Sequence, residues 1–269
     1  MIRGARILVI GFGNMGQALV KGFVQNGIHP SRIHIVDPNP ATEKLTDEMG
    51  LDYSKTTEGI THPPAMVLLA VKPQIMDIAL ESVKELASDT VCFLSIAAGI
   101  NIAHMKKFLG DDARIVRAMP NTPAPIGEGM TVMAHTGNLA FEQMALADSL
   151  MECVGMSEWI DDESQMDGVT AVSGSGPAYV FLLMEAMIEA GKKNGLSEKL
   201  ARQLAVQTCK GAAILASKSD EPPHVLRENV TSKGGTTEAA LNSLFEQKFP
   251  EIVNNAIQKA TERSIELSK

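Results

Sequence analysis

The sequence predicts an α/β protein with an N-terminal Rossmann-type doubly wound sheet followed by an all-helical C-terminal domain. Three observations lead to this fold class. Short apolar runs alternate with longer amphipathic segments from residue 6 to about residue 160, as in parallel strands joined by crossover helices. A glycine-rich loop follows the first apolar run directly. After Trp159 no strand-like run bounded by turns occurs, so the rest is predicted to be helical.

The predicted strands are short and rich in β-branched or other apolar residues. Several are almost continuously apolar, as a sheet covered by helices on both faces requires. They lie at residues 6–10, 32–37, 66–71, 90–96, 114–118, 129–134 and 157–160. Because helical segments separate most of them, the strands are predicted to run parallel to one another.

The predicted helices show apolar residues at helical spacing. In the first half they lie at residues 15–25, 41–49, 74–87, 102–109 and about 139–153. In the second half they lie at residues 166–172, 177–193, 198–216, 223–230, 236–247 and 249–267. The acidic stretch Asp161-Asp162-Glu163 is the predicted junction, which divides the chain into residues 1–162 and residues 163–269.

The helix predicted at residues 177–193 is apolar on more than one side. Between Val180 and Ile188 only Glu185 is charged. A helical unit of about a hundred residues cannot bury so much apolar surface alone, so we expect an oligomer interface. Burial against the first domain is the alternative.

Composition and charge exclude several classes of protein. The chain has 269 residues, 45% of them hydrophobic, and a formal net charge of −8, so we expect no nucleic-acid partner, which would need a basic face. No uninterrupted run approaches the ~18 apolar residues that span a membrane, so no membrane partner is expected. Three widely spaced cysteines and six scattered histidines favour a reducing cytoplasm and no metal.

The glycine-rich loop reads Gly11-Phe12-Gly13-Asn14-Met15-Gly16 and opens a predicted helix. In this pattern the first glycine makes a tight turn, the second admits a pyrophosphate to the backbone, and the third lets the helix pack on the strand. Free N–H groups at the helix start then face the phosphates. The loop predicts dinucleotide binding, with a purely structural turn as the alternative.

The choice between NADH and NADPH is open from the sequence. The second predicted strand ends at Asp37, where a carboxylate would bind the ribose 2′-hydroxyl and disfavour a 2′-phosphate. That observation favours NADH. However, the following Pro38-Asn39-Pro40 could turn Asp37 away from the ribose.

A second informative segment is LRENVTSKGGTTEAALNSL, residues 226–244. Paired glycines before a helix leave several N–H groups unpaired, which suits a small carboxylate. The hydroxyls of Ser232, Thr236 and Thr237 could donate to the same ligand. A capped helical hairpin without a ligand is the alternative.

These motifs together resemble those of one known enzyme family. The segment at residues 226–244 resembles the signature of pyrroline-5-carboxylate reductase, V-[ST]-S-x-G-G-x-T followed by an apolar helix. The resemblance covers essentially the whole chain. It includes the motifs at Gly11–Gly16, Ala70-Val71-Lys72-Pro73, Ala97-Ala98-Gly99, Met119-Pro120-Asn121-Thr122-Pro123 and Ser173-Gly174-Ser175-Gly176-Pro177-Ala178-Tyr179.

The resemblance implies an NAD(P)H-dependent reductase that reduces 1-pyrroline-5-carboxylate to L-proline, the last step of proline synthesis. It also implies a C-terminal helical domain that binds substrate and forms a homodimer, often assembled into a ring of dimers. Together with the observations above, it predicts that the following residues contact the cofactor, NADPH or NADH: Ile10, Gly11, Phe12, Gly13, Asn14, Met15, Gly16, Asp37, Ala70, Val71, Lys72, Pro73, Ala97, Ala98 and Asn229. Residues implied to contact the substrate are Glu163, Ser232, Gly235, Thr236 and Thr237.

The implied reaction is hydride addition to the carbon of a protonated C=N bond. The task of the protein is then mainly positioning. The substrate carboxylate would lie on the Gly-Gly-Thr-Thr helix start, and the Thr237 hydroxyl would bond the ring nitrogen. Threonine is a poor general acid, so solvent or a protonated substrate must supply the proton. Thr237 is accordingly the predicted catalytic residue.

Two other functions compete with this interpretation. Lys192-Lys193-Asn194, late in a predicted helix, resembles the lysine and asparagine of the β-hydroxyacid dehydrogenases, whose first motif is also G-x-G-x-M-G. Adjacent lysines near a helix C-terminus, however, usually interact with the helix dipole. A non-catalytic dinucleotide sensor would keep the glycine loop and would have no use for the intact Gly234-Gly235-Thr236-Thr237 run.

Overall fold

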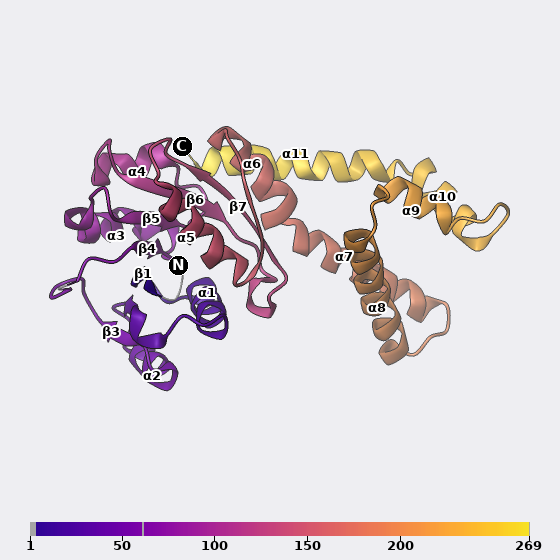
Figure 1. Cartoon of the computed structure of the whole chain (residues 1–269). Coiled ribbons are helices and arrows are strands. Elements are labelled where there is room, and N and C mark those ends of the chain that lie inside the picture. Colours follow the sequence, from indigo (N-terminus) through magenta and orange to yellow (C-terminus); the bar gives the residue numbers. More distant parts are fainter. Residues whose placement is uncertain (1–3, 61, 269) are drawn as a thin grey trace. The chain divides into compact units, whose positions relative to one another are not determined.

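Within the described residues, 4–60 and 62–268 of this computed structural model, eight strands form one sheet in the order β3-β2-β1-β4-β5-β6-β7-β8 (Figure 1). The strands are β1 Ile7–Ile10, β2 Ile33–Val36, β3 Asp52–Ser54, β4 Met66–Leu69, β5 Cys92–Ser95, β6 Arg114–Met119, β7 Gly129–His135 and β8 Gly155–Trp159. Each predicted strand is present, most with slightly different ends. The Rossmann-type α/β fold predicted for the first half is confirmed.

The prediction that all strands run parallel is wrong for one pair. β6 and β7 are antiparallel, with Val116 opposite His135, whereas every other pair in the sheet is parallel. The connection at residues 120–128 contains only the short 3₁₀ turn Ala124–Ile126. A parallel crossover needs a dozen or more residues, so the chain reverses direction here instead.

The strand β3 was not predicted. It has three residues, Asp52-Tyr53-Ser54, and none of them is fully buried. A short edge strand without an apolar run gives no periodic signal in the sequence. Its presence matters because its carboxyl end lies beside that of β2 in a parallel sheet.

The sheet is buried on both faces, and successive strand residues alternate between two cores. Ile7 and Val9 pack on one face with Phe23 of the helix at residues 14–25 and Leu150 of the helix at residues 141–152. On the other face, another set of buried strand residues packs with the helices at residues 76–83 and 102–109, the set being Leu8, Ile10, Val67, Leu69 and Phe93. Burial on both faces explains why these strands are almost entirely apolar.

The helices of the first half are α1 Asn14–Gln25, α2 Pro40–Met49, α3 Met76–Val83, α4 Ile102–Leu109 and α5 Phe141–Glu152. The side chain of Asn39 caps α2 by accepting from the Ala41 N–H, and Asn101 caps α4 by accepting from the His104 N–H. Short polar residues with free acceptors favour these helix starts. The 3₁₀ turns Pro73–Ile75 and Lys84–Leu86 account for the longer single helix predicted at 74–87.

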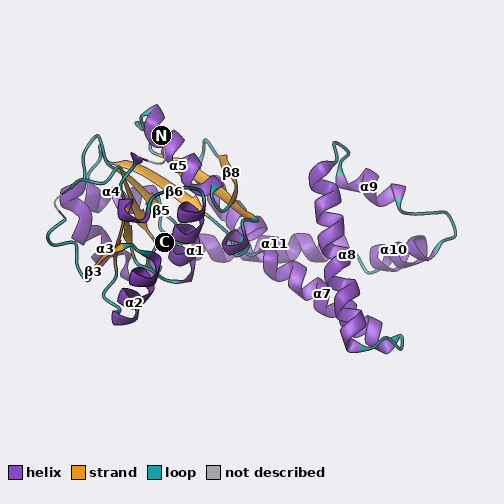
Figure 2. Cartoon of the chain, turned by 60° about the horizontal axis from the view of Figure 1, so that its bottom comes forward, coloured by secondary structure: helices purple, strands orange, loops and turns teal. Residues whose placement is uncertain are grey.

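After β8 the described chain contains only helices and loops (Figure 2). They are α6 Met166–Val169, α7 Gly176–Lys193, α8 Glu198–Lys218, α9 Pro223–Asn229, α10 Thr236–Glu246 and α11 Phe249–Leu267. A π-helical turn, Thr170–Gly174, separates α6 from α7. The predicted all-helical C-terminal half is confirmed.

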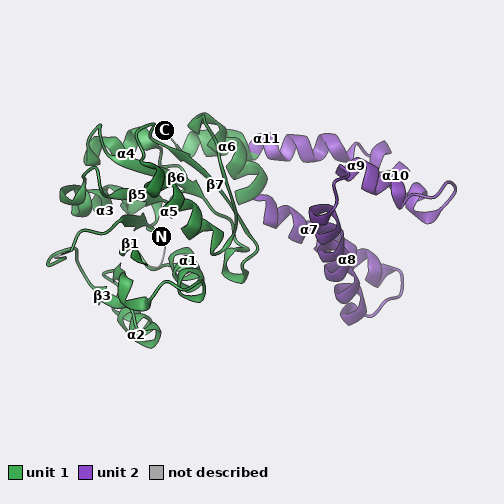
Figure 3. Ribbon diagram, in the orientation of Figure 1, with its two compact units in different colours: residues 1–174, 260–269 green, residues 175–259 purple. Residues whose placement is uncertain are grey.

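Two compact units divide the chain (Figure 3). The first contains residues 1–174 and 260–269, and the second contains residues 175–259. The last residues join the first unit through Ser264, whose buried hydroxyl donates to Asp167 Oδ1 at 2.6 Å. These packing units do not test the functional division expected at residue 162, which stays a prediction.

Among the described residues, one helical stretch, Glu163–Lys193, is long and apolar enough to cross a membrane by length and composition. The sequence expectation concerned uninterrupted apolar runs, and glycine, serine and threonine break such a run without ending the helix. The expected absence of a membrane partner stays a prediction. Only 6% of the apolar window is buried within the chain, so its surface is open to a covering partner.

Candidate functional site

The glycine-rich loop has a geometry that only glycine permits at its first position. Gly11 has φ +88°, and an added Cβ would lie 2.7 Å from Val71 Cγ1 and 2.9 Å from the Ala70 carbonyl oxygen. Gly16 is also constrained, because a Cβ there would lie 3.0 Å from the Gly11 carbonyl oxygen. The start of the loop therefore packs tightly against the residues that follow β4, and the third glycine packs against the first.

The middle glycine, Gly13, faces open space, since no atom lies within 4 Å of a Cβ built on it. It is the N-cap of α1 and has no side chain to cap the helix. The N–H groups of Asn14, Met15 and Gly16 have no intrahelical acceptor, because the first such bond runs from Gln17 to Gly13. This open helix start fits the pyrophosphate of a dinucleotide.

A cavity of about 670 Å³ opens beside this loop, within the first unit. Its walls come from the carboxyl ends of β1, β2, β3 and β4 and from α3. The sequence-predicted residues that line it are Ile10, Gly11, Phe12, Gly13, Asp37, Ala70, Val71 and Lys72. The structure therefore brings these eight residues together around one space large enough for part of a dinucleotide.

The remaining predicted cofactor residues of the first unit lie close to this edge of the sheet. Pro73 begins the 3₁₀ turn that follows Lys72. Ala97 and Ala98 follow the carboxyl end of β5, and the Ala97 N–H donates to the Ser95 hydroxyl at 3.3 Å. Ligands of open α/β sheets bind at this carboxyl edge.

The carboxylate of Asp37 is held by the backbone. Its Oδ2 accepts from the Phe12 N–H at 2.7 Å, and its Oδ1 accepts from the Asn39 N–H at 2.8 Å. The Tyr53 hydroxyl donates to the Asp37 carbonyl oxygen at 3.0 Å. Asp37 therefore braces the glycine loop, a role that the sequence did not reveal.

Glu163 lies in the first unit and bonds two elements at once. Its Oε1 accepts from the Ile102 N–H at the start of α4 and from Arg117 Nη1 on β6, both at 2.9 Å. The Arg117 side chain is only 7% exposed, so this ion pair is largely desolvated. Next to it, hydrogen bonds from Ser164 hold the pKa of Asp162 below its ordinary value.

The predicted substrate residues of the second unit gather at the start of α10. Gly234 has φ +72°, the Gly235 N–H donates to the Ser232 carbonyl oxygen at 3.0 Å, and Gly235 is the N-cap. The N–H groups of Thr236, Thr237 and Glu238 precede the first intrahelical bond and have no intrahelical acceptor. This start therefore has the free N–H donors that the predicted anion receptor requires, and its binding of a carboxylate stays a prediction.

Hydroxyl groups add to this receptor, and one carboxylate already occupies part of the loop. Among the described residues, the side chains of Ser232, Thr236 and Thr237 make no hydrogen bond and can all donate to a ligand. The Gly234 N–H, by contrast, donates to Glu238 Oε2 at 2.6 Å. Sequence reasoning missed this use of Glu238.

Asn229 is the last residue of α9, in the second unit. Its Nδ2 donates to Glu221 Oε2 at 3.0 Å. It thus lies in the same unit as the start of α10, six residues before Gly235 in the chain. Its predicted contact with the cofactor stays a prediction.

Two of the three residues that favoured a β-hydroxyacid dehydrogenase, Lys192 and Asn194, have structural partners. Lys192 Nζ is 2.8 Å from Glu189 Oε1, one turn earlier on α7, and this bond raises the pKa of the lysine. Asn194 is the C-cap of α7, and its side chain donates to the Ala190 carbonyl oxygen at 2.8 Å. Both side chains are used at the end of this helix.

Sequence reasoning missed nine residues of the cavity wall, among them Lys55, Thr56 and Thr57. Lys55, Thr56 and Thr57 follow β3, a short edge strand that has no apolar run to reveal it. The only available signal is positional, because any strand added beside β2 in a parallel sheet delivers its next residues to the cofactor edge. Within the described residues, no three His, Cys, Asp or Glu side chains are grouped so as to hold a metal.

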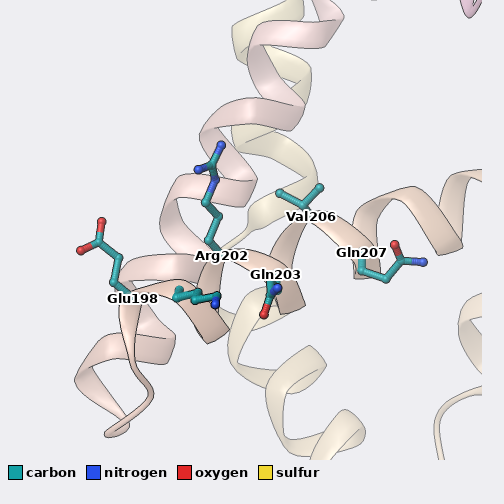
Figure 4. A pocket seen from close by; sticks show the side chains of 6 residues that line it. Glu198, Arg202, Gln203, Val206 and Gln207 are labelled. Atoms are coloured by element: carbon teal, nitrogen blue, oxygen red, sulfur yellow. The ribbon is translucent and has the colours of Figure 1, made fainter.

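The second unit presents open surface on its helices. A groove of about 860 Å³ runs along α8 and is lined by Arg202, Gln203, Val206 and their neighbours on the same face (Figure 4). On α7, apolar side chains are exposed, including Phe181 at 56% and Leu182 at 65%. A single chain leaves this apolar surface in water, as subunits of an oligomer do before association.

Comparison with known proteins gives two family matches. Residues 6–99 match the family of coenzyme F420-dependent NADP oxidoreductases. Residues 163–267 match the pyrroline-5-carboxylate reductase dimerisation family. The first match contains the glycine loop, and the second contains the start of α10 and the exposed helices.

Relatives match over the whole length. The chain is 40% identical to pyrroline-5-carboxylate reductase of Pseudomonas aeruginosa, over 98% of this chain and 97% of that protein. A pyrroline-5-carboxylate reductase structure from Coxiella burnetii has a TM-score of 0.94 and 36% identity, over 98% of this chain and 99% of the other. The Plasmodium falciparum pyrroline carboxylate reductase with NADP bound has a TM-score of 0.87 and 33% identity, over 99% of both chains. The chain belongs to the pyrroline-5-carboxylate reductase family.

Proposed function

We propose that this protein reduces 1-pyrroline-5-carboxylate to L-proline with a hydride from NADPH or NADH, as the last step of proline biosynthesis. The observation that carries the proposal is the full-length likeness to reductases of that name. The geometry supports it, because the chain combines a dinucleotide cavity with an anion-accepting helix start. The reaction needs one of each.

The glycine loop is proposed to hold the cofactor, which supplies the hydride when it is bound. The residues fit such a group, because Gly13 leaves open space above three unpaired N–H groups at the start of α1. Ala70, Val71 and Lys72 form the facing wall of the same cavity. Pro73, Ala97, Ala98 and Asn229 are proposed to complete the cofactor site.

The start of α10 is proposed to hold the substrate carboxylate. Three N–H groups and the hydroxyls of Ser232 and Thr236 can donate to its two oxygens. The positive end of the helix dipole adds to this attraction. The Gly234 N–H already donates to Glu238 and the Gly235 N–H to the Ser232 carbonyl oxygen. The substrate carboxylate is therefore expected to accept from the free N–H groups of Thr236, Thr237 and Glu238.

Thr237 is proposed to hold the ring nitrogen. In the protonated imine the nitrogen carries a hydrogen, which would be donated to the Thr237 hydroxyl oxygen. Hydride then adds to the imine carbon, the C=N π electrons move to the nitrogen, and the nitrogen keeps its proton in the secondary amine of proline. No strong acid is required, so positioning is the main contribution of the chain.

Glu163 is proposed to act on the substrate side of the site. Its carboxylate is fixed by Arg117 and by the Ile102 N–H, so it can present charge without moving. A fixed carboxylate would favour the protonated form of a nearby imine nitrogen. This role adds to positioning by Thr237.

The exposed apolar helices are proposed to form a homodimer, and the dimers a ring. The dimerisation-family match over residues 163–267 and the exposed side chains of α7 support the dimer. Covering these side chains with a second copy would remove apolar area from water, the main driving force of association. We place the reaction in the cytoplasm, which agrees with three free cysteines.

Neither alternative function is favoured. Lys192, one of the two lysines in the motif that resembles a β-hydroxyacid dehydrogenase, is bound to Glu189. The full-length relatives are pyrroline-5-carboxylate reductases. A cofactor sensor would not need the free hydroxyl and N–H groups at the start of α10. Turnover of 3-hydroxy acids with NAD(P)⁺ by the purified protein would reverse this preference.

The proposal is tested by initial rates with 1-pyrroline-5-carboxylate, using NADPH and NADH side by side. Wild type is expected to oxidise at least one of them only when the substrate is present. Thr237→Ala is expected to lower kcat/KM by roughly 10- to 1,000-fold, and Thr237→Ser, which keeps the hydroxyl, is expected to recover most of the loss. Unchanged kinetics in Thr237→Ala would remove this residue from the mechanism.

A further inference from the structure

The carboxyl ends of β2 and β3 lie side by side at the cofactor cavity. In the register of this parallel pair, Val36 is opposite Ser54, and the Asp37 N–H donates to the Ser54 carbonyl oxygen at 3.2 Å. The next residue on each strand is therefore Asp37 on β2 and Lys55 on β3, and both line the cavity. The Asp37 carboxylate and the Lys55 ammonium group thus border the position where this fold binds the adenosine ribose of a dinucleotide.

The Asp37 carboxylate already accepts hydrogen bonds from the protein backbone. Both Asp37 oxygens accept backbone N–H bonds, from Phe12 at 2.7 Å and from Asn39 at 2.8 Å. These bonds hold the side chain against the glycine loop and stabilise its charge. A ribose 2′-hydroxyl would have to share oxygens that are already occupied, which weakens the argument for NADH from Asp37 alone.

The Lys55 ammonium group, by contrast, has no ion-pair partner among the described residues. Lys55 is exposed. The Thr56 hydroxyl makes no hydrogen bond to any described residue either. Thr57 is different, because its hydroxyl donates to the Ser82 carbonyl oxygen at 2.8 Å and so ties the loop to the end of α3. The loop is anchored at Thr57 and presents two free donors just before it.

We propose that Lys55, assisted by the Thr56 hydroxyl, binds the 2′-phosphate of NADPH and makes NADPH the preferred hydride donor of this chain. The inference rests on the proposed function only in taking the cavity as the cofactor site. A 2′-phosphate is a dianionic group with several strong acceptors, and a lysine serves it as a point charge. Lys55 offsets the repulsion from Asp37, whose charge is partly satisfied by two N–H groups.

The test measures nucleotide binding without substrate, by titration calorimetry of the full-length protein. The probes are 2′,5′-ADP, which carries the 2′-phosphate, and 5′-ADP, which lacks it. Wild type is expected to bind 2′,5′-ADP more tightly. Lys55→Met is expected to weaken 2′,5′-ADP binding about 10-fold or more, the scale of a hydrogen bond to a charged group, and to change 5′-ADP binding less than about 2-fold.

The matched control is Lys44→Met, because Lys44 is 85% exposed on α2 and forms a loose pair with Glu48 at 3.9 Å. It removes the same charge outside the cavity wall and should change neither affinity. Lys55→Arg should keep most of the preference. Equal weakening of both nucleotides in Lys55→Met, or no weakening of either, would overturn the inference.

The same variants in the reductase assay separate this inference from the proposed function. If wild type reduces 1-pyrroline-5-carboxylate and Lys55→Met raises KM for NADPH and not for NADH, both stand. If no imine reduction occurs but Lys55→Met loses 2′,5′-ADP selectively, the proposed function fails and the inference survives. If reduction occurs without any selective nucleotide effect, the inference alone fails.

Discussion

Arg117 and Glu163 form the most buried ion pair among the described residues, at 2.9 Å. The pair joins β6 to the turn that leads into α6, and Glu163 also satisfies the first N–H of α4. Removing one partner of a desolvated pair leaves the other without its counter-charge. The Glu163 carboxylate therefore stabilises the local fold, and the same carboxylate is the one proposed to act on the substrate.

Arg117→Met is therefore expected to lower the free energy of unfolding by ~1–3 kcal/mol, because Glu163 is still partly solvated and keeps its bond to the Ile102 N–H. Urea denaturation of the purified variant measures this change. Arg263→Met is the control, since its pair with Glu266 is exposed on both sides, and it should change stability by less than about 0.5 kcal/mol. A loss no larger than that of the control would show that the buried pair does not stabilise the fold.

Single residues were predicted unevenly, and the reason is physical. Gly11, Gly13 and Gly16 could be assigned because each has a backbone requirement visible in the motif spacing. The direction of the Asp37 carboxylate depends on the turn at residues 38–39 and could not be deduced from its position in the chain. Lys55 had no signal of its own, because its importance arises only from the strand pairing that brings it beside Asp37.

In the turn between β1 and α1, one glycine is required by the fold and another is proposed to make room for the cofactor. An alanine at Gly11 would combine a left-handed φ with contacts of 2.7 and 2.9 Å, whereas an alanine at Gly13 meets nothing within 4 Å and has an ordinary φ of −71°. Substitution of Gly11 is therefore expected to impair folding, and substitution of Gly13 is expected to impair cofactor binding. One supports the fold, and the other leaves room for a ligand.

Gly11→Ala is expected to lower the free energy of unfolding by roughly 2–5 kcal/mol through strain and overpacking. Gly13→Ala is expected to change stability by less than about 1 kcal/mol and to weaken NADPH binding by about 10-fold or more, because the methyl group enters the space proposed for the pyrophosphate. Thermal unfolding and fluorescence titration with NADPH distinguish the two effects. A Gly13→Ala protein with wild-type affinity would argue against this loop as the cofactor site.

Elements with a strong periodic pattern were predicted well. The seven apolar strands and the long helices follow from burial on one or both faces, which the sequence records directly. The edge strand β3 and the antiparallel direction of β7 were missed for another reason. Neither is encoded in apolar periodicity: one depends on pairing with β2 and the other on the length of a connection.

For the whole molecule, the exposed helices of the second unit predict assembly. Leu182 is 65% exposed in the single chain, so a charge there should have little effect on the folding of one subunit. In an apolar interface the same charge would be desolvated without a partner. Leu182→Glu is accordingly expected to shift the molar mass in solution toward the 28.8 kDa of one chain, as measured by light scattering.

Phe141→Glu is the matched control, because Phe141 is 76% exposed and lies at the start of α5 in the first unit. It should leave the mass of the assembly unchanged. A wild-type protein that is monomeric at micromolar concentration would contradict the proposed dimer directly. The predicted assembly follows from the exposed apolar side chains of α7, whose apolar character is visible in the sequence at residues 177–193.

The central claim is that the glycine loop and the start of α10 act on one and the same imine in the assembled enzyme. The most direct test is a crystal structure of the protein with NADPH and L-proline bound together. The account predicts the proline carboxylate on the N–H groups at residues 236–238 and its nitrogen within hydrogen-bond distance of the Thr237 hydroxyl. It also predicts the nicotinamide C4 ~3–3.5 Å from the ring carbon that accepts hydride. Proline bound away from residues 234–237, or a nicotinamide far from it in every subunit, would contradict the account.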